Sequence, residues 1–109
     1  MQAVLNYPKI AVIRPQGDLN ATNALEFERD MTTVLAQNGV SILVVDLAAV
    51  ESLDSAGLMA LLSTHKLALT LGRSFQICAV APSIRIIFEL TQLDKVFEIL
   101  DSEAELAQT

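Results

Sequence analysis

The sequence has 109 residues, 52% of them hydrophobic, with 13 acidic and 7 basic side chains and a formal net charge of −6. This length suits one domain covering residues 1–109, and this hydrophobic content excludes a disordered chain. The negative charge and the scattered basic residues argue against direct binding to nucleic acid. No apolar run approaches the ~20 residues of a membrane-spanning helix, and residues 1–8 lack the pattern of a signal peptide. We therefore expect a cytoplasmic protein without direct membrane insertion.

Strand-like and helical segments alternate along the chain, which predicts a sheet covered by helices. Residues 9–14 are short and β-branched, and residues 3–5 are a candidate antiparallel hairpin partner for them. Asn23, followed by Glu26, resembles a capping box, so we expect the first helix to begin there and to end at residues 38–39. The apolar stripe expected for this helix is Ala24, Phe27, Met31 and Val34.

The middle of the chain contains the most apolar segment. Residues 41–45 include an uninterrupted apolar run, typical of a strand covered on both faces, so we place this strand at the centre of the sheet. Residues 57–71 predict a second helix that ends at Gly72, and residues 74–80 predict a further strand. The face that we expect this helix to bury carries Leu58, Leu61, Leu62, His65 and Leu69.

The last third of the chain predicts two more helices and a short strand. Proline at position 82 suits the first turn of a helix over residues 82–90, and residues 96–100 indicate a final strand. Ser102 and Glu105 resemble a capping box for a last helical segment. The lone cysteine, Cys78, cannot form an internal disulfide and lies in an apolar stretch, so we expect a buried, inert thiol.

Polar residues concentrate in residues 46–58, between the central strand and the second helix. This segment reads Asp-Leu-Ala-Ala-Val-Glu-Ser-Leu-Asp-Ser-Ala-Gly-Leu. Either Asp54 or Ser55 can cap the helix through a side-chain oxygen, and Gly57 lets the backbone turn tightly. Capping alone would account for this composition, and a functional serine is the alternative.

The same segment resembles the phosphorylation loop of anti-sigma-factor antagonists with a STAS domain, in which a strand ending in Asp-Leu is followed by Asp-Ser-x-Gly-Leu. Residues 17–20, Gly-Asp-Leu-Asn, resemble the glycine-centred loop of that family, which often has an acid at the place of Asn20. Residues 81–84 and 90–97 follow the family plan as well, except that Gln92 replaces a common glycine. The resemblance covers nearly the whole chain.

This resemblance implies an α/β fold, a STAS-like single domain with a mixed four- or five-stranded sheet and about four helices packed against it. It also implies that Ser55 is phosphorylated by a partner anti-sigma-factor serine kinase. The unmodified form would bind that kinase and release the sigma factor for transcription, and a metal-dependent serine phosphatase would reset the switch. We expect no enzymatic activity, no cofactor and no metal site.

The resemblance further implies a surface that contacts the partner. Asp18 and Asp54 would shape the loop that faces the kinase. For Met59, a surface position and a partner contact both remain open. The partner-binding residues expected from the resemblance are Asp18, Asn20, Asp54, Ser55, Ala56, Gly57 and Met59.

Three other functions are compatible with parts of the sequence. An enzyme could use Ser55 as nucleophile and His65 as base, although the glycine-serine elbow and a third member are missing, and packing is the simpler role for His65. A receiver-like domain could be phosphorylated on Asp46, although the acidic pair and the lysine of receivers are not in position. A STAS domain could instead be a regulatory or scaffold subunit of a membrane transporter or lipid-trafficking complex.

Overall fold

A computed structural model of the protein describes residues 9–101. The predicted hairpin partner at residues 3–5 and the predicted capping box of Ser102 and Glu105 lie outside the described residues. The described elements are β1 (Lys9–Ile13), β2 (Gly17–Leu19), α1 (Ala24–Leu35), β3 (Val40–Asp46), β4 (Val50–Leu53), α2 (Ser55–Leu71), β5 (Ser74–Cys78), α3 (Pro82–Leu90), the 3₁₀ helix η1 (Leu93–Lys95) and β6 (Glu98–Leu100).

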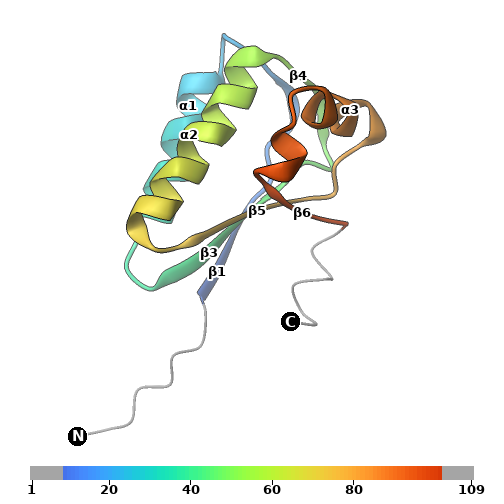
Figure 1. The fold of residues 1–109 in the computed structure, drawn as a ribbon. Coiled ribbons are helices and arrows are strands. Elements are labelled where there is room, and N and C mark those ends of the chain that lie inside the picture. Colours follow the sequence, from blue (N-terminus) through green and yellow to red (C-terminus); the bar gives the residue numbers. More distant parts are fainter. Residues whose placement is uncertain (1–8, 102–109) are drawn as a thin grey trace, which may run out of the picture.

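The strands form two sheets, and α1 and α2 lie side by side against the larger one (Figure 1). The larger sheet has the order β1-β3-β5-β6, and β2 pairs with β4 in a separate two-stranded sheet. All pairings among residues 9–101 are parallel. The antiparallel pairing that would make the sheet mixed was predicted for residues 3–5, so residues 9–101 do not test it.

The central position of β3 is confirmed. Leu43, Val44 and Val45 are fully buried, and β3 pairs with β1 on one side and β5 on the other. A strand with neighbours on both edges needs consecutive apolar residues when both faces are covered, which explains the uninterrupted run. Cys78, at the end of β5, is also fully buried, as expected.

The buried face predicted for α2 is wrong in part. Leu69 is 66% exposed, whereas Leu61 is fully buried. The residues that α2 buries are mostly small: Gly57, Ala60, Leu61, Thr64 and Ala68. Small side chains let a helix approach its neighbours closely, so contact with α1, β4 and β5 favours this stripe over the row of leucines. The Thr64 hydroxyl donates to the Ala60 carbonyl oxygen at 2.9 Å, which satisfies its polar atom inside the core. The end of α2 at Gly72 is confirmed, and its φ of 69° is the left-handed conformation that glycine favours.

Helix α1 ends earlier than predicted, at Leu35, where a distant side chain bonds to carbonyl groups at the helix end and just beyond it. The Arg73 guanidinium donates to the carbonyl oxygens of Leu35 and Gln37. A cation at the C-terminus of a helix also interacts favourably with the helix dipole. Leu35 is fully buried and Val34 only partly, so the predicted apolar stripe is shifted by one residue at its end.

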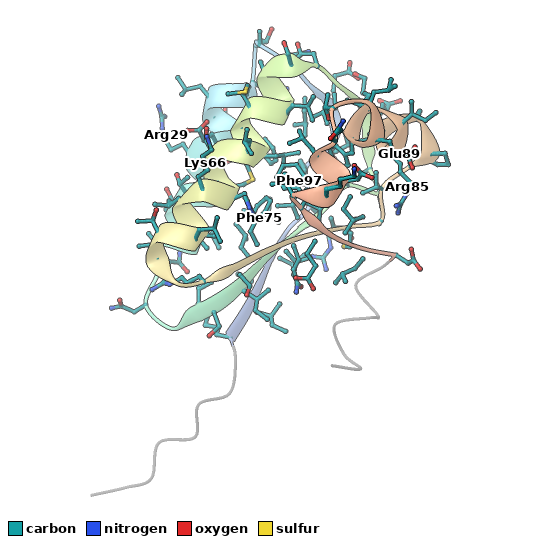
Figure 2. The ribbon with its side chains drawn as sticks, viewed as in Figure 1. Arg29, Lys66, Phe75, Arg85, Glu89 and Phe97 are labelled. Carbon is teal, nitrogen blue, oxygen red and sulfur yellow. The ribbon has the colours of Figure 1, made fainter. Side chains whose placement is uncertain are left out.

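An aromatic cluster joins α2 to the C-terminal elements (Figure 2). The ring of Phe97 lies 5.7 Å from His65, 5.9 Å from Phe75 and 5.7 Å from Phe88, measured between ring centroids. His65 is partly buried and also meets Phe75 edge-on, so its expected packing role is confirmed. Aromatic pairs at such distances contribute about 0.5–1.5 kcal/mol beyond the burial of their area.

Candidate functional site

The small sheet of β2 and β4 builds the candidate site, and the sequence did not predict it. Leu19 pairs with Leu53, and Asp18 pairs with Ser52. Parallel strands end at the same edge, so the loop after β2 and the start of α2 after β4 lie next to each other. Strands of three and four residues are too short to show an alternating pattern, which explains why they were missed.

Gly57 is required where α2 crosses the end of β2. A Cβ atom at this position would lie 2.6 Å from Cδ1 of Leu53 and 2.8 Å from the carbonyl oxygen of Leu19. Since the second contact is with backbone, a side chain here would push α2 away from the small sheet. The glycine of the Asp-Ser-x-Gly segment therefore serves close packing, whereas the sequence suggested a tight turn.

Asp54 is the N-cap of α2, so the choice between Asp54 and Ser55 as capping residue is resolved. Its Oδ1 accepts a hydrogen bond from the backbone N–H of Gly57 at 3.1 Å. Its Oδ2 accepts from the N–H of Ala21 at 3.3 Å, and its own N–H donates to the Leu19 carbonyl oxygen at 3.0 Å. One residue thus ties the start of α2 to the loop after β2.

Ser55 is the first residue of α2 and is exposed. None of the hydrogen bonds within residues 9–101 involves its hydroxyl, because Asp54 provides the cap. An exposed hydroxyl at a helix N-terminus is accessible to a partner, and the helix dipole favours negative charge at this position. Ala56, next along the chain, is partly buried.

Asp18, Asn20 and Asn23 organise the loop that faces Ser55. Asp18 Oδ1 accepts from the Ser52 hydroxyl at 2.6 Å, across the small sheet. The Asn23 side chain donates through Nδ2 to the Asp18 carbonyl oxygen at 2.7 Å and accepts through Oδ1 from the Asn20 N–H at 3.0 Å. The predicted capping box of Asn23 and Glu26 is therefore wrong, because the Asn23 side chain turns back into the loop and makes no cap hydrogen bond to α1.

Exposed apolar side chains lie at the start of both helices. Met59 is 57% exposed on α2, four residues after Ser55, and Leu25 is 70% exposed at the second position of α1. Leu25 was missed by the sequence analysis. The only available signal was a leucine next to the buried stripe of α1, which is too weak to single it out.

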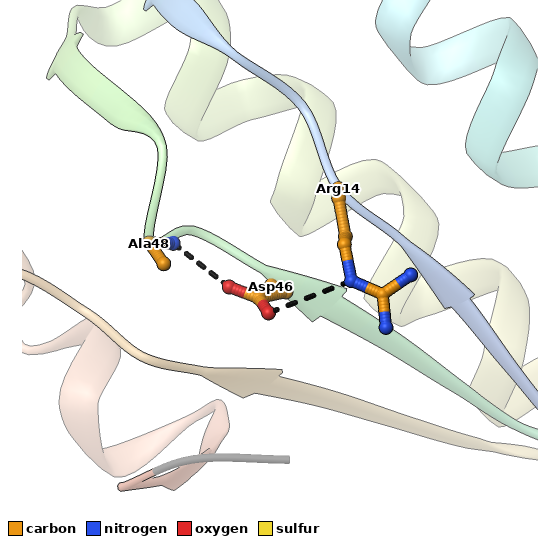
Figure 3. Close-up of polar contacts among 3 residues, drawn as sticks. All are labelled: Arg14, Asp46 and Ala48. Carbon is orange, nitrogen blue, oxygen red and sulfur yellow. Dashed lines mark hydrogen bonds and ion pairs between the residues drawn. The ribbon is translucent and has the colours of Figure 1, made fainter.

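Asp46 lies at the end of β3, and its carboxylate is occupied (Figure 3). Oδ1 accepts from the Ala48 N–H at 2.8 Å, and Oδ2 lies 3.8 Å from Arg14 Nε in an ion pair. A receiver-type phosphorylation site would need this carboxylate free and surrounded by metal-binding acids. In the part of the chain that the structure describes, no three metal-ligating side chains come together, so the geometry does not support this alternative.

His65 is too far from Ser55 to act as its base. The two residues are ten positions apart on one continuous helix, which separates them by about 15 Å along its axis. His65 instead packs against Phe75 and Phe97. The geometry therefore does not support a nucleophile–base pair of Ser55 and His65.

Comparison with protein families finds that residues 2–106 match the model of the STAS domain, so the chain belongs to the STAS domain family. None of the helices among residues 9–101 has the length and apolar character needed to cross a membrane.

Solved structures of this fold come from more than one kind of protein. An anti-sigma factor antagonist from Mycobacterium paratuberculosis is 30% identical with a TM-score of 0.80, covering 91% of this chain and 83% of that one. The unphosphorylated anti-sigma factor antagonist SpoIIAA is 17% identical with a TM-score of 0.77, covering 98% and 93%. The STAS domain of a SulP transporter from Vibrio cholerae is 20% identical with a TM-score of 0.70, covering 91% and 82%.

Proposed function

We propose that this protein is an anti-sigma-factor antagonist, and that phosphorylation of Ser55 by a partner anti-sigma-factor serine kinase controls its binding. The observation that carries the proposal is the Ser55 hydroxyl, exposed at the first position of α2 and outside the hydrogen bonds of residues 9–101. The 30% identical antagonist from Mycobacterium paratuberculosis supports this role. The protein then acts as a binding partner and a kinase substrate in the cytoplasm, and as no enzyme itself.

The surroundings of Ser55 explain how one phosphate can change binding without unfolding the domain. A phosphoserine adds a charge of about −1.5 to −2, which the N-terminus of α2 tolerates. The same charge stands beside the Asp54 carboxylate, and the two would confront a partner surface adapted to a neutral hydroxyl. Like charges across an interface cost several kcal/mol, and a shift from mostly bound to mostly free needs about 5.5 kcal/mol. A metal-dependent serine phosphatase would reverse the change.

The test is incubation of the protein with ATP and the anti-sigma-factor kinases of the same organism, followed by mass spectrometry to locate the phosphate. We expect one phosphate on Ser55 and none in Ser55→Ala. Ser83→Ala is the matched control, because Ser83 is also an exposed serine in the first turn of a helix, α3. Full labelling of this control is expected, and a phosphate that stays in Ser55→Ala contradicts the proposal.

The alternative is a regulatory or scaffold subunit of a membrane transporter or lipid-trafficking complex. The likeness to the STAS domain of the SulP transporter supports it at the level of the fold. The same experiment separates the two functions, because a scaffold subunit does not require phosphorylation of Ser55 by an anti-sigma-factor kinase.

A further inference from the structure

A groove of about 330 Å³ lies next to the candidate site, between the end of β1 and the first two turns of α1. Its floor is apolar and consists of Ile13, Pro15, Leu19 and Phe27. The groove adjoins the candidate site through two of its lining residues, since Leu19 accepts the hydrogen bond from the Asp54 N–H and Asn23 bonds to the loop after β2. A partner that covers Ser55 would therefore come close to this groove.

The α1 side of the groove carries two carboxylates, from Glu26 and Asp30. Both side chains are exposed, and neither forms an ion pair within residues 9–101. They are four residues apart on one helix face, where like charges destabilise the helix slightly. The basic residue of the rim, Arg14, extends toward Asp46 at the end of β3 (Figure 3). The groove thus combines an apolar floor with two carboxylates, while the one arginine of its lining is engaged with Asp46.

We propose that this groove binds an arginine side chain of the partner protein that docks at Ser55. The partner's methylene groups would pack on the apolar floor while its head group meets Glu26 and Asp30. Arginine fits better than lysine, because its planar guanidinium offers several donors at once and can bridge two carboxylates one helical turn apart. The Asn23 side chain, also in the groove, already uses its amide within the loop and leaves recognition to the carboxylates. This inference rests on the proposed function for the identity of the partner.

The experiment measures by calorimetry the Kd between the unphosphorylated protein and the kinase that phosphorylates Ser55. The groove variant is Glu26→Gln with Asp30→Asn, which removes two charges and keeps the size of both side chains. The matched control is Glu89→Gln with Asp94→Asn, two exposed acids on α3 and η1, which changes the net charge equally. The net charge is thereby equal in the two variants, so a larger loss of affinity in the groove variant reports charges that lie close to the partner.

We expect the Kd to rise at least tenfold in the groove variant and less than twofold in the control, with both melting temperatures close to wild type. Equal weakening in the two variants, or none in either, overturns the inference while the phosphorylation of Ser55 stands. The partner's surface arginines are then replaced by lysine, one at a time. We expect one such replacement to weaken binding to the wild-type protein and to have no further effect on binding to the groove variant.

If no kinase acts on Ser55, the proposed function fails and the groove is tested alone. The probes are N-acetyl-arginine methylamide and its neutral citrulline analogue, titrated into ¹⁵N-labelled protein. We expect saturable amide shifts at Glu26, Phe27 and Asp30 with the arginine probe, and none in the groove variant. Equal shifts with citrulline, or no shifts with either probe, overturn the inference.

Discussion

The candidate site around Ser55 and the aromatic cluster around Phe97 are held together in different ways. Around Ser55, Asp18, Asn23 and Asp54 join short segments through side-chain bonds to backbone and hydroxyl groups. In the aromatic cluster, Phe75 and Phe97 pack with their aromatic neighbours between α2 and the C-terminal elements.

This difference predicts that substitutions in the aromatic cluster mainly affect stability, whereas substitutions around Ser55 mainly affect function. A typical hydrogen bond contributes about 0.5–1.5 kcal/mol net, whereas truncation of a buried aromatic residue costs about 3–5 kcal/mol. Substitutions in the aromatic cluster should therefore lower stability with little direct effect on the switch. Substitutions around Ser55 should change phosphorylation and partner binding with only a modest loss of stability.

The largest effect is expected for Phe97→Ala. Phe97 is 4% exposed and contacts three other rings, so its truncation should lower the free energy of unfolding by about 3–5 kcal/mol. Urea denaturation followed by circular dichroism measures the loss. The fraction that stays folded should be phosphorylated on Ser55 at the wild-type rate. A slower rate in that fraction would show that the aromatic cluster and the Ser55 site are coupled.

A smaller loss is expected for Gly57→Ala. Alanine normally stabilises a helix relative to glycine by about 1 kcal/mol, but the added Cβ would lie 2.8 Å from the Leu19 carbonyl oxygen. We expect a net loss of about 1–3 kcal/mol in urea denaturation, since overpacking against backbone costs this much. Phosphorylation of Ser55 should also slow, because α2 must move relative to the loop. If Gly57→Ala is more stable than the wild type, the small sheet accommodates the added methyl group without a loss of stability.

Asp54→Asn is expected to change phosphorylation more than stability. Asparagine is an equally good N-cap, so the bond to the Gly57 N–H can be kept and only the weaker bond to the Ala21 N–H is lost. The free energy of unfolding should change by less than about 1 kcal/mol. Ser55 phosphorylation should slow clearly if the carboxylate orients the serine or meets a basic group of the kinase. Unchanged kinetics would restrict Asp54 to its structural role, and Asp54→Ala measures that role, at about 1 kcal/mol.

Long elements with strong local signals could be predicted from the sequence. The apolar run of β3, the stop at Gly72 and the start of α3 at Pro82 depend on residues next to one another, and all three are confirmed. The buried face of α2 was partly wrong because this helix is apolar on most sides, so periodicity could not show which side packs closely. The packing of small residues against α1, β4 and β5 decides it.

The Ser55 segment could be recognised from its pattern, but its supports could not. Asp18 bonds to Ser52, and Asp54 bonds to the N–H of Ala21, across more than thirty residues of chain. Such contacts depend on the pairing of β2 with β4, which is too short to leave a periodic signal. For the same reason, the close approach that requires Gly57 became apparent only in the structure.

The smallest effect concerns a strained residue between α3 and η1, Gln92, which replaces the glycine common in the family. The sequence left this turn open, and the structure keeps it by holding Gln92 in the left-handed conformation, with a φ of 61°. The turn is fixed by its backbone, since the N–H donates to the Glu89 carbonyl oxygen at 3.1 Å and the carbonyl oxygen accepts from the Lys95 N–H at 3.2 Å. The side chain is exposed, so its removal loses no packing.

Gln92→Gly should therefore stabilise the protein slightly. The left-handed conformation costs a non-glycine residue about 1–2 kcal/mol, and Gln92→Gly would remove this cost. Part of the gain in stability is lost again, because glycine raises the conformational entropy of the unfolded chain. We expect a net gain of about 0.5–1 kcal/mol, or several degrees in melting temperature, measured by differential scanning calorimetry. Ala36→Gly is the control, because Ala36 is also exposed but has a φ of −82°. Glycine relieves no strain at this position and should cost about 0.5–1 kcal/mol of stability. If both variants lose stability alike, the turn at Gln92 carries no strain. A gain at Gln92 alone, with Ser55 phosphorylated at the wild-type rate, would show that this turn can be stabilised without changing the switch.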